Sequence, residues 1–527
     1  MRFQTLWQMP LLLGVAATSI AYSAGIAPAG PVAAVAAPAP IVAAAPAAVS
    51  AAGTVDTATL MKQIEELKKQ VAHVAYKQRK SEEKLESEIR VDDAKIGVLQ
   101  ANQVSAFPTG FIAVPGTNSA IKIGGRIKAD GAYYPRSNAN AKNIEFDGTV
   151  IPLRNQEVNA AKSGFVQGGI ANSRIEFTSL SHTNQGDVKG WIQTDFDSSL
   201  NLAGGPNNYT GTSYVPRIRH AIVEWKSLTV GQTLTNFHDS EGVTTLDNNG
   251  LGNVVRRVQV KWTEKLGEGL SLSVAAENPN TDYVTQNGAT GNNSNLGKSG
   301  LPDLTARLRL EGKQGFVSLR GIVRRLEVNV QPTEAAGGVT ALNQFANKQT
   351  GWGLGTSFKL ITSGLSGFNG QVTFGDGINN FLAVESLPSA YLQLPASATP
   401  AAGNNGTHTQ ARFDTLSGAS AILGYEHWWT DQFRTTIAGS YTKVKNSSFA
   451  PVSAAGSQLN SRLKKAVVNA IYSPVKQMDI GVEVMYGTRE TIGGTVDTAG
   501  TNAPVGSQYA GGTGRATQIM TSFIYKF

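Results

Sequence analysis

The chain has 527 residues, 41% of them hydrophobic, a formal net charge of +8 and no cysteine. The lack of cysteine excludes disulfide frameworks and thiolate metal sites. A mean hydropathy of −0.15, with no long apolar run after residue 25, excludes a protein built of membrane-spanning helices. The basic residues are spread singly along alternating segments, which argues against a nucleic-acid surface and favours a water-filled passage for anions.

The first part of the chain changes composition abruptly. Residues 1–24 hold a short apolar run and small residues at Ala21 and Ala24, which predicts a secretory signal peptide cut after one of these two alanines. Residues 25–54 are almost wholly Ala, Pro, Val and Gly. This composition is typical of a semi-stiff, extended spacer.

Residues 55–101 predict a charged helix with an apolar seam. Five apolar residues recur at alternating intervals of four and three, the spacing of a and d positions in a coiled coil. They are Leu60, Ile64, Leu67, Val71 and Val74. The register resumes at Leu85 with a four-residue shift. We predict a coiled coil, with a lone charged helix as the alternative, and the seam residues leave the number of its strands open.

From residue 118 to the end, apolar and polar residues alternate in sixteen segments of strand length. These segments are 120–135, 170–182, 187–198, 215–226, 227–234, 254–264, 269–277, 302–312, 315–326, 348–360, 366–376, 411–426, 431–444, 461–473, 477–490 and 513–527. Long gaps follow the odd segments and tight turns follow the even ones, as an up-and-down outer-membrane barrel requires. We therefore predict that residues 118–527 form an all-β transmembrane barrel of sixteen antiparallel strands, with the turns and the N-terminal coil in the periplasm.

The last segment ends on three aromatic residues that share one face of a strand. They are Phe523, Tyr525 and Phe527. The last strand of a membrane barrel must pair with the first, and its aromatic residues belong at the membrane interface. We interpret these residues as an assembly signal; the alternative is an ordinary edge strand of a soluble sandwich.

Alternation also predicts which basic side chains point into the lumen. An arginine facing lipid at mid-depth costs about 2–4 kcal/mol, so basic residues set between outward Ile, Val and Trp are expected to point inward. The inward set is Arg126, Arg174, Arg217, Arg219, Arg257, Lys261, Arg307, Arg309, Arg320, Arg324 and Arg434. The same register puts Ile222 and His220 on the outer face.

The gap after the fifth segment carries an acidic set, Asp239, Glu241 and Asp247. An acidic loop opposite a ring of arginines would create a transverse field across a narrow aqueous gap and guide carboxylates or phosphates. The alternative is that the arginines only solvate the lumen or pair with nearby carboxylates. His238 could bind a cation or act as a pH-sensitive gate, but a plain polar loop residue is the simpler interpretation.

Several stretches carry a family resemblance. The run Arg217-Ile-Arg-His-Ala-Ile-Val-Glu-Trp, followed by Thr-Val-Gly-Gln-Thr and the acidic loop, resembles the sixteen-stranded trimeric porins. The coil, the segment Ala113-Val-Pro-Gly-Thr-Asn-Ser-Ala-Ile-Lys-Ile-Gly-Gly and the run Ser173-Arg-Ile-Glu-Phe resemble the narrower DcaP-like family over about 55–527. The resemblance implies a homotrimer in the outer membrane, a third outer loop that narrows the lumen, and uptake of dicarboxylates and other small anions.

The six histidines form no metal motif, and no nucleophile stands with a base, so the sequence predicts no enzyme, no cofactor and no metal. The favoured interpretation is a passive porin in the outer membrane of a Gram-negative bacterium, with membrane lipid and small anionic solutes as partners and no nucleic acid. One alternative is a structural anchor whose N-terminal arm contacts the cell wall. A surface adhesin is a third.

Overall fold

The structure is a computed structural model. It describes residues 57–104, 107–136, 144–153, 164–197, 215–239, 243–248, 250–252, 254–285, 290–291, 296–330, 345–382, 387–393, 411–447, 459–492, 494–495, 508–509 and 511–527. The predicted signal peptide and spacer lie outside these residues.

Helix α1 (Thr57–Val104) belongs to a compact unit separate from the barrel. Taken alone, it leaves the seam in water: Ile64, Leu67, Val71 and Val74 are 47–64% exposed. The helix predicted for residues 55–101 is therefore present, and its pairing into a coiled coil stays a prediction. Among the described residues, no helix is long and apolar enough to cross a membrane.

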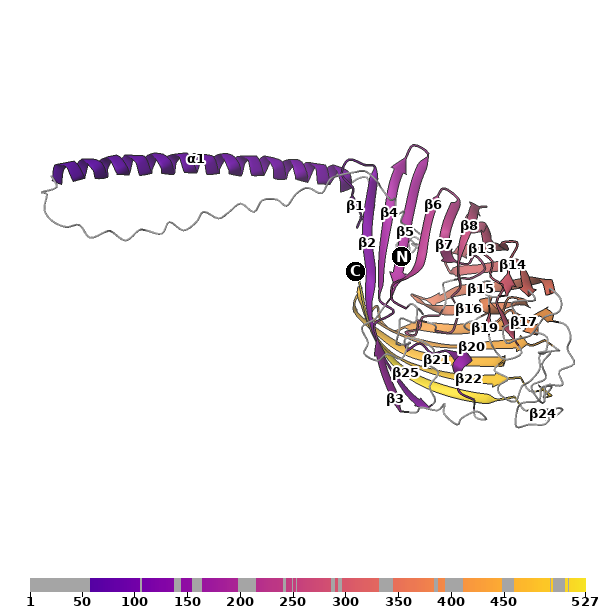
Figure 1. The fold of residues 1–527 in the computed structure, drawn as a ribbon. Helices are drawn as coiled ribbons and strands as arrows, with labels where there is room; N and C mark the ends of the chain where they lie inside the picture. The colour runs from indigo at the N-terminus through magenta and orange to yellow at the C-terminus, as the bar shows by residue number, and fades with distance from the viewer. Residues whose placement is uncertain are drawn as a thin grey trace. The chain divides into compact units, whose positions relative to one another are not determined.

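Sixteen antiparallel strands form a sheet that closes on itself, as predicted (Figure 1). In order they are β2 (Ser119–Arg136), β4 (Arg174–Thr183), β5 (Gly186–Asp195), β6 (Arg217–Trp225), β7 (Leu228–Leu234), β8 (Arg256–Lys265), β9 (Leu270–Glu277), β13 (Asp303–Gly312), β14 (Gly315–Val330), β15 (Phe345–Ser363), β16 (Ser366–Asp376), β19 (Ser417–Trp428), β20 (Phe433–Lys445), β21 (Asn460–Val475), β22 (Met478–Thr491) and β25 (Thr513–Lys526). Each pairs with the next in this order, and β25 pairs with β2. Fifteen of the sixteen predicted segments match a strand to within a few residues. The segment predicted at 411–426 is the exception, because its first part belongs to a separate small sheet.

The remaining strands are short. Three of them belong to the barrel sheet: β1 (Ile112–Ala113) and β3 (Phe165–Gly169) pair with β2, and β12 (Gly297–Lys298) pairs with β14. Six lie in two small sheets of the loops: β10 (Tyr283–Thr285), β11 (Thr290–Gly291), β17 (Ala390–Gln393), β18 (Arg412–Thr415), β23 (Gly494–Thr495) and β24 (Gln508–Tyr509). The described loop residues also include two single-turn 3₁₀ helices, η1 (Gly148–Val150) and η3 (Asn379–Phe381).

The seam between β2 and β25 extends to the last residue. The Phe527 amide donates to the Gly125 carbonyl at 3.1 Å, and the Gly125 amide donates back at 3.0 Å. Phe523, Tyr525 and Phe527 are 41–53% exposed, and Tyr525 and Phe523 are register partners of Ile127 and Ala129. The three aromatic residues therefore lie at the closing seam, and their role in assembly stays a prediction.

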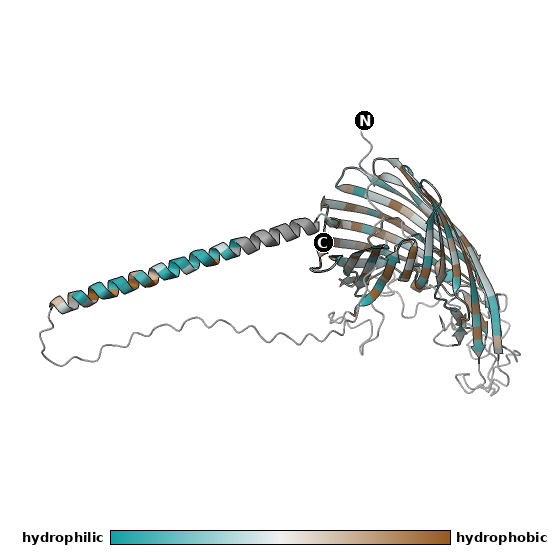
Figure 2. Ribbon diagram, turned by 90° about the horizontal axis from the view of Figure 1, so that it is seen from above, coloured by the Kyte–Doolittle hydropathy of each residue, from teal (hydrophilic) through white to brown (hydrophobic). Residues whose placement is uncertain are grey.

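The two faces of the sheet differ in chemistry, as the alternating colours along the strands in Figure 2 show. On β15, Trp352 and Leu354 point outward with 46% and 50% exposure, while Gly351, Gly353 and Gly355 line the inside. A Cβ atom on Gly353 would lie 3.1 Å from the Phe237 ring and 2.7 Å from Ile378. Glycine on the inner face thus lets the loops lie directly against the wall.

One strand departs from the predicted alternation. On β6, His220 pairs with Gln193 of β5 and Ile218 pairs with the next residue, Thr194. Arg219 has no partner in this pairing and forms a β-bulge. Beyond it the faces are exchanged: Ile222 is 2% exposed and His220 is 6% exposed. The prediction that both face outward was wrong. His220 points inward, where it stacks on Trp191 with ring centroids 4.5 Å apart.

Candidate constriction

The third long loop, residues 235–255 and here called loop L3, lies inside the barrel. It leaves β7 and touches inner-face side chains of β13, β14 and β15, then those of β21 and β22. These strands are far apart in the order of the sheet, so the loop crosses the lumen and narrows it. Glu241 lies outside the described residues.

Asp239 fixes the first part of loop L3 to the wall. Its carboxylate accepts hydrogen bonds from Arg309 Nη1 at 3.0 Å, Ser318 Oγ at 2.7 Å and Ser357 Oγ at 2.8 Å. Burial raises the pKa of Asp239, but the charge of Arg307 and these hydrogen bonds outweigh it and hold the pKa below its usual range. Asp239 is 5% exposed, so it binds an arginine directly instead of opposing one across an open gap.

Two more arginines hold the backbone beside Asp239. Arg320 Nη1 donates to the Phe237 carbonyl at 2.9 Å, and Arg307 Nη1 donates to the His238 carbonyl at 3.4 Å. Burial, together with the charge of Arg320, lowers the pKa of His238 to about 4. His238 is therefore uncharged at neutral pH, which disfavours the interpretation of this residue as a gate that titrates near pH 7.

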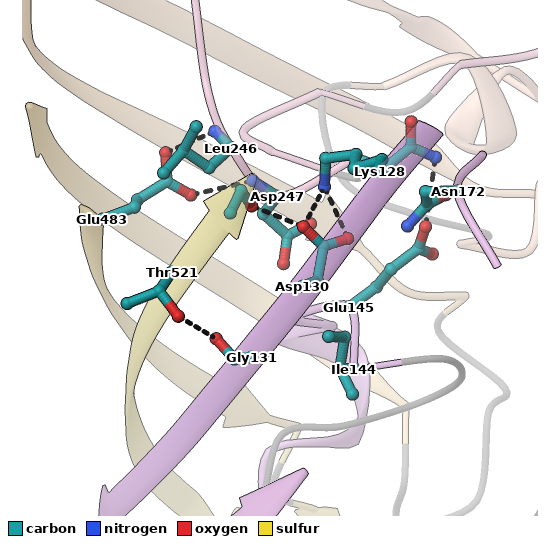
Figure 3. Close-up of polar contacts among 12 residues, drawn as sticks. Lys128, Asp130, Gly131, Ile144, Glu145, Asn172, Leu246, Asp247, Glu483 and Thr521 are labelled. Carbon is teal, nitrogen blue, oxygen red and sulfur yellow. Dashed lines mark hydrogen bonds and ion pairs between the residues drawn. The ribbon is translucent and has the colours of Figure 1, made fainter. Parts of the chain in front are cut away.

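The second part of loop L3 is held by the opposite wall (Figure 3). The Glu483 carboxylate accepts from the amides of Leu246 at 2.7 Å and Asp247 at 3.0 Å. Lys465 Nζ donates to the Gly250 carbonyl at 2.8 Å, and Asn469 donates to the Thr244 carbonyl at 2.9 Å. The sequence did not indicate these anchors, because each lies more than 200 positions from its partner.

The first long loop also enters the lumen. Its described segment, residues 144–153 and here called the L1 segment, packs Phe146 against Val467 and Met485 on the inner wall. The Phe146 amide donates to Asp247 at 2.7 Å, and the Gly250 amide donates to the same carboxylate at 3.1 Å. Asp247 therefore joins two loops, a role that the sequence did not predict for it.

Glu145 stands at this junction among other acids. Burial, with the charges of Asp197 and Asp247, raises the pKa of Glu145 to about 8 from 4.5, against opposing effects of Asn248 and Arg217. Between pH 4.5 and pH 8 the docked L1 segment keeps a proton that a released segment loses. Docking therefore weakens as the pH rises through this window and is weakest above pH 8.

We expect Glu145→Gln to strengthen docking of the L1 segment at pH 8 and to change it little below pH 4.5. The gain should exceed roughly 1 kcal/mol, about the equivalent of one pKa unit. Hydrogen exchange of the Phe146 amide, corrected for the intrinsic dependence on pH, measures it. The exposed Glu268→Gln is the matched control, and wild-type protection that grows with pH would contradict the expectation.

A first group of arginines lines one side of the lumen. Arg126 and Arg174 are direct cross-strand partners on β2 and β4. Arg126 Nε donates to the Asn172 carbonyl at 3.2 Å, and Arg174 Nη2 donates to the Asn248 side chain at 2.8 Å. Neither of these hydrogen bonds goes to a carboxylate.

The nearby carboxylates are bound by other arginines. Arg217 contacts Asp195 at 2.8 Å and Asp197 at 2.9 Å, and Arg219 also pairs with Asp195. Arg256, at the start of β8, interacts electrostatically with Arg217 and Arg219. The sequence pattern did not predict Arg256 as a lumen residue. Alternation placed Arg257 inward, and the residue next to it was therefore assigned to the other face.

A second group lies around η3 and is mostly structural. The guanidinium carbons of Arg257 and Arg324 lie 5.7 and 5.2 Å from the Phe381 ring centroid. Arg324 also donates to the Gly377 carbonyl at 3.1 Å and contacts Asp303 at 3.4 Å. Arg324 is 2% exposed, and its bond to Gly377 fixes the described start of the sixth long loop to the inner wall.

Two of the predicted basic residues lie away from loop L3 contacts. Arg434 donates to Ser473 at 2.9 Å and contacts Asp479 at 3.5 Å, close to the short turns. Lys261 lies on β8 between the outward Val260 and Trp262, which are 52% and 49% exposed. The eleven predicted basic residues therefore divide into loop anchors, a first group beside loop L3, and residues nearer the turns.

A protein-family model described as DcaP outer membrane protein matches residues 48–501. Among solved structures, the chain is similar to the outer membrane channel DcaP of Acinetobacter baumannii, at 20% identity and a TM-score of 0.56, over 79% of this chain and 99% of that chain. It is also similar to an anion-selective porin from Comamonas acidovorans, at 11% identity and a TM-score of 0.42, over 78% and 100% of the two chains. No curated protein matches the chain.

Proposed function

The chain belongs to the DcaP outer membrane protein family and is an outer-membrane porin, and we propose that it passes small anionic solutes, dicarboxylates among them, by passive diffusion. The observation that carries this proposal is the first arginine group. Arg126 and Arg174 stand side by side on the inner wall, and their hydrogen bonds go to a carbonyl and an amide. Their charge remains available to a passing anion.

The mechanism is electrostatic. Loop L3 narrows the lumen to a gap beside these arginines, and the low-dielectric wall around the gap strengthens their field. A guanidinium offers a carboxylate paired, parallel hydrogen bonds. The charge of the loop's Asp239 is balanced by its ion pair with Arg309, and Asp247 accepts hydrogen bonds from two backbone amides. A solute meets a local positive potential that is weak enough to release it.

A planar-bilayer recording of the purified protein under a salt gradient tests this proposal. We expect each insertion event to give three equal conductance steps, one for each subunit of a homotrimer. The reversal potential should be displaced toward that of the anion. Chloride and a series of mono- and dicarboxylates should then compete for the same current. A cation-selective or silent channel would contradict the proposal.

We also propose that the exposed seam of α1 pairs with the same seam of the other subunits. Ile64, Leu67, Val71 and Val74 are too exposed for a helix that acts alone. If the barrel is trimeric, the coiled coil is trimeric too. An even number of strands puts both ends of the barrel on one side, so the coil lies in the periplasm with the short turns.

A second candidate function is tethering of the outer membrane to the cell wall by this arm. The feature that favours it is the N-terminal hundred residues, which passive diffusion does not require. We expect deletion of residues 25–100 to leave single-channel conductance unchanged, because no described lumen contact comes from this part. Loss of envelope integrity with intact conductance would assign tethering to the arm. Loss of conductance would contradict the division of roles.

A further inference from the structure

Basic residues also gather on the outer wall, near the long-loop ends of four adjacent strands. Ile437 on β20, Val468 on β21 and Val484 on β22 point outward, with exposures of 62%, 53% and 44%. Steps of two residues from these positions lead along the same face to Lys443, Lys464 and Glu490. The intervening residues Leu463 and Met485 are at most 1% exposed, which confirms that the alternation persists.

The strand register joins these residues into one surface. Lys443 pairs with Arg462 and Arg462 pairs with Glu490. Lys464 pairs with Thr488 and Thr488 pairs with Arg515. We call the set the basic patch; it consists of Lys443, Arg462, Lys464, Glu490 and Arg515. Four positive charges and one negative charge give a net charge of +3, and Arg462 contacts Glu490 at 2.6 Å.

The patch cannot act on solutes in the lumen, because it lies on the other side of the wall. It is also too charged for the hydrocarbon region, where a basic residue costs about 2–4 kcal/mol at mid-depth. Two tyrosines, 41% and 40% exposed, lie on the same outer face: Tyr441 is the cross-strand partner of Lys464, and Tyr486 lies one step of two residues closer to the apolar Val484. Tyrosines mark the head-group level of a membrane, so the patch lies at that level or just beyond.

We propose that the basic patch binds the phosphate groups of a phosphorylated glycolipid in the outer leaflet. Adjacent strands are about 4.8 Å apart, so a patch over four strands spans about 14 Å. This width suits a head group with more than one phosphate better than a single phosphodiester. The outward Lys443, Lys464 and Arg515 are exposed and free to turn toward such groups. The inference rests on the proposed orientation of the barrel, with its long loops outside the cell.

The test compares K443Q/K464Q/R515Q with the matched control K265Q/K313Q/K476Q. The control removes the same charge from exposed residues at or beside the short turns. Diphosphorylated lipid A is titrated into each full-length protein in detergent, and the bound fraction is measured by native mass spectrometry. Each basic residue near an anionic lipid is worth about fivefold in affinity, so three substitutions should weaken binding roughly a hundredfold. The control should bind like the wild type.

Two further titrations make the outcome decisive. Phosphatidylglycerol should bind the wild type more weakly than lipid A does. Lipid A without its phosphates should bind the patch variant and the control variant with equal affinity. Equal binding of lipid A to the patch variant and the wild type would overturn the proposal, as would equal affinity for phosphatidylglycerol. Reversal potentials of the same proteins report separately on anion selectivity, so failure of the proposed transport function is distinguished from failure of lipid binding.

Discussion

Replacement of Asp239 by Ala should release the first part of loop L3 and raise the single-channel conductance. The substitution removes the acceptor of three hydrogen bonds, from Arg309, Ser318 and Ser357. It also leaves the buried guanidinium of Arg309 without that carboxylate, and breaking a buried ion pair in this way costs about 3–5 kcal/mol. A loop held mainly by a few such contacts would then populate undocked states, and the narrowed gap would widen.

The effect is measured by the single-channel conductance, by the current fluctuations that brief closures cause, and by the permeability to larger solutes. Glu311→Gln is the matched control, because Glu311 contacts the same Arg309 at 3.2 Å and forms no hydrogen bond or ion pair with the described residues of loop L3. Asp239→Asn should give an intermediate result, since its amide oxygen still accepts one or two hydrogen bonds. Unchanged conductance in Asp239→Ala would mean that Glu483, Lys465 and the backbone contacts hold the loop without Asp239.

The barrel was predictable because closing a sheet in a membrane constrains every strand in the same way. Each strand must present apolar residues to the outside, and the two ends of the barrel have loops of different length. Trp352 and Leu354 therefore alternate with glycines whether or not their partners are known. The cost of a lipid-facing arginine likewise determines that Arg320, between Leu319 and Gly321, points inward.

The bulge at Arg219 could not be predicted from the same alternation. Ile222 is apolar and suits either face, so the sequence around it reads equally well with and without the bulge. His220 was the one sign of conflict, because the unbroken register puts a polar ring in contact with lipid. In the folded chain His220 has inner-face partners instead, the Trp191 ring and Thr233 Oγ1 at 2.9 Å.

The pairing of charges inside the lumen also lay beyond the sequence. Alternation and composition predict that both Asp239 and Arg309 face the lumen. They do not predict whether the two side chains face each other across a gap or form a direct ion pair. Contacts such as that between Asp247 and Glu483, 236 positions apart, depend on the path of the loops. The outer-wall lysines show the same limit, because the near-uniform spread of basic residues suggested the lumen for nearly all of them.

The double variant Arg126→Gln, Arg174→Gln should reduce the preference for anions more than any other pair of substitutions. These two residues are cross-strand partners whose hydrogen bonds go to a carbonyl and an amide, whereas Arg217 and Arg219 already share Asp195. A charge about 4 Å from an ion is worth about 1 kcal/mol even in bulk water, or roughly fivefold. The anion-to-cation permeability ratio should therefore fall by about an order of magnitude.

The dependence on salt separates this field from a change in pore width. The Debye length is about 10 Å at 0.1 M salt and about 3 Å at 1 M, so the difference from the wild type should shrink at high salt. A wider pore would keep its larger conductance at both concentrations. The control Arg462→Gln, Arg515→Gln removes the same charge from the outer wall and should leave the ratio unchanged. If both variants kept the wild-type ratio, the arginines beside Asn172 and Asn248 would not set the selectivity, and the field would have to come from Arg256 and Arg257 on the next part of the wall.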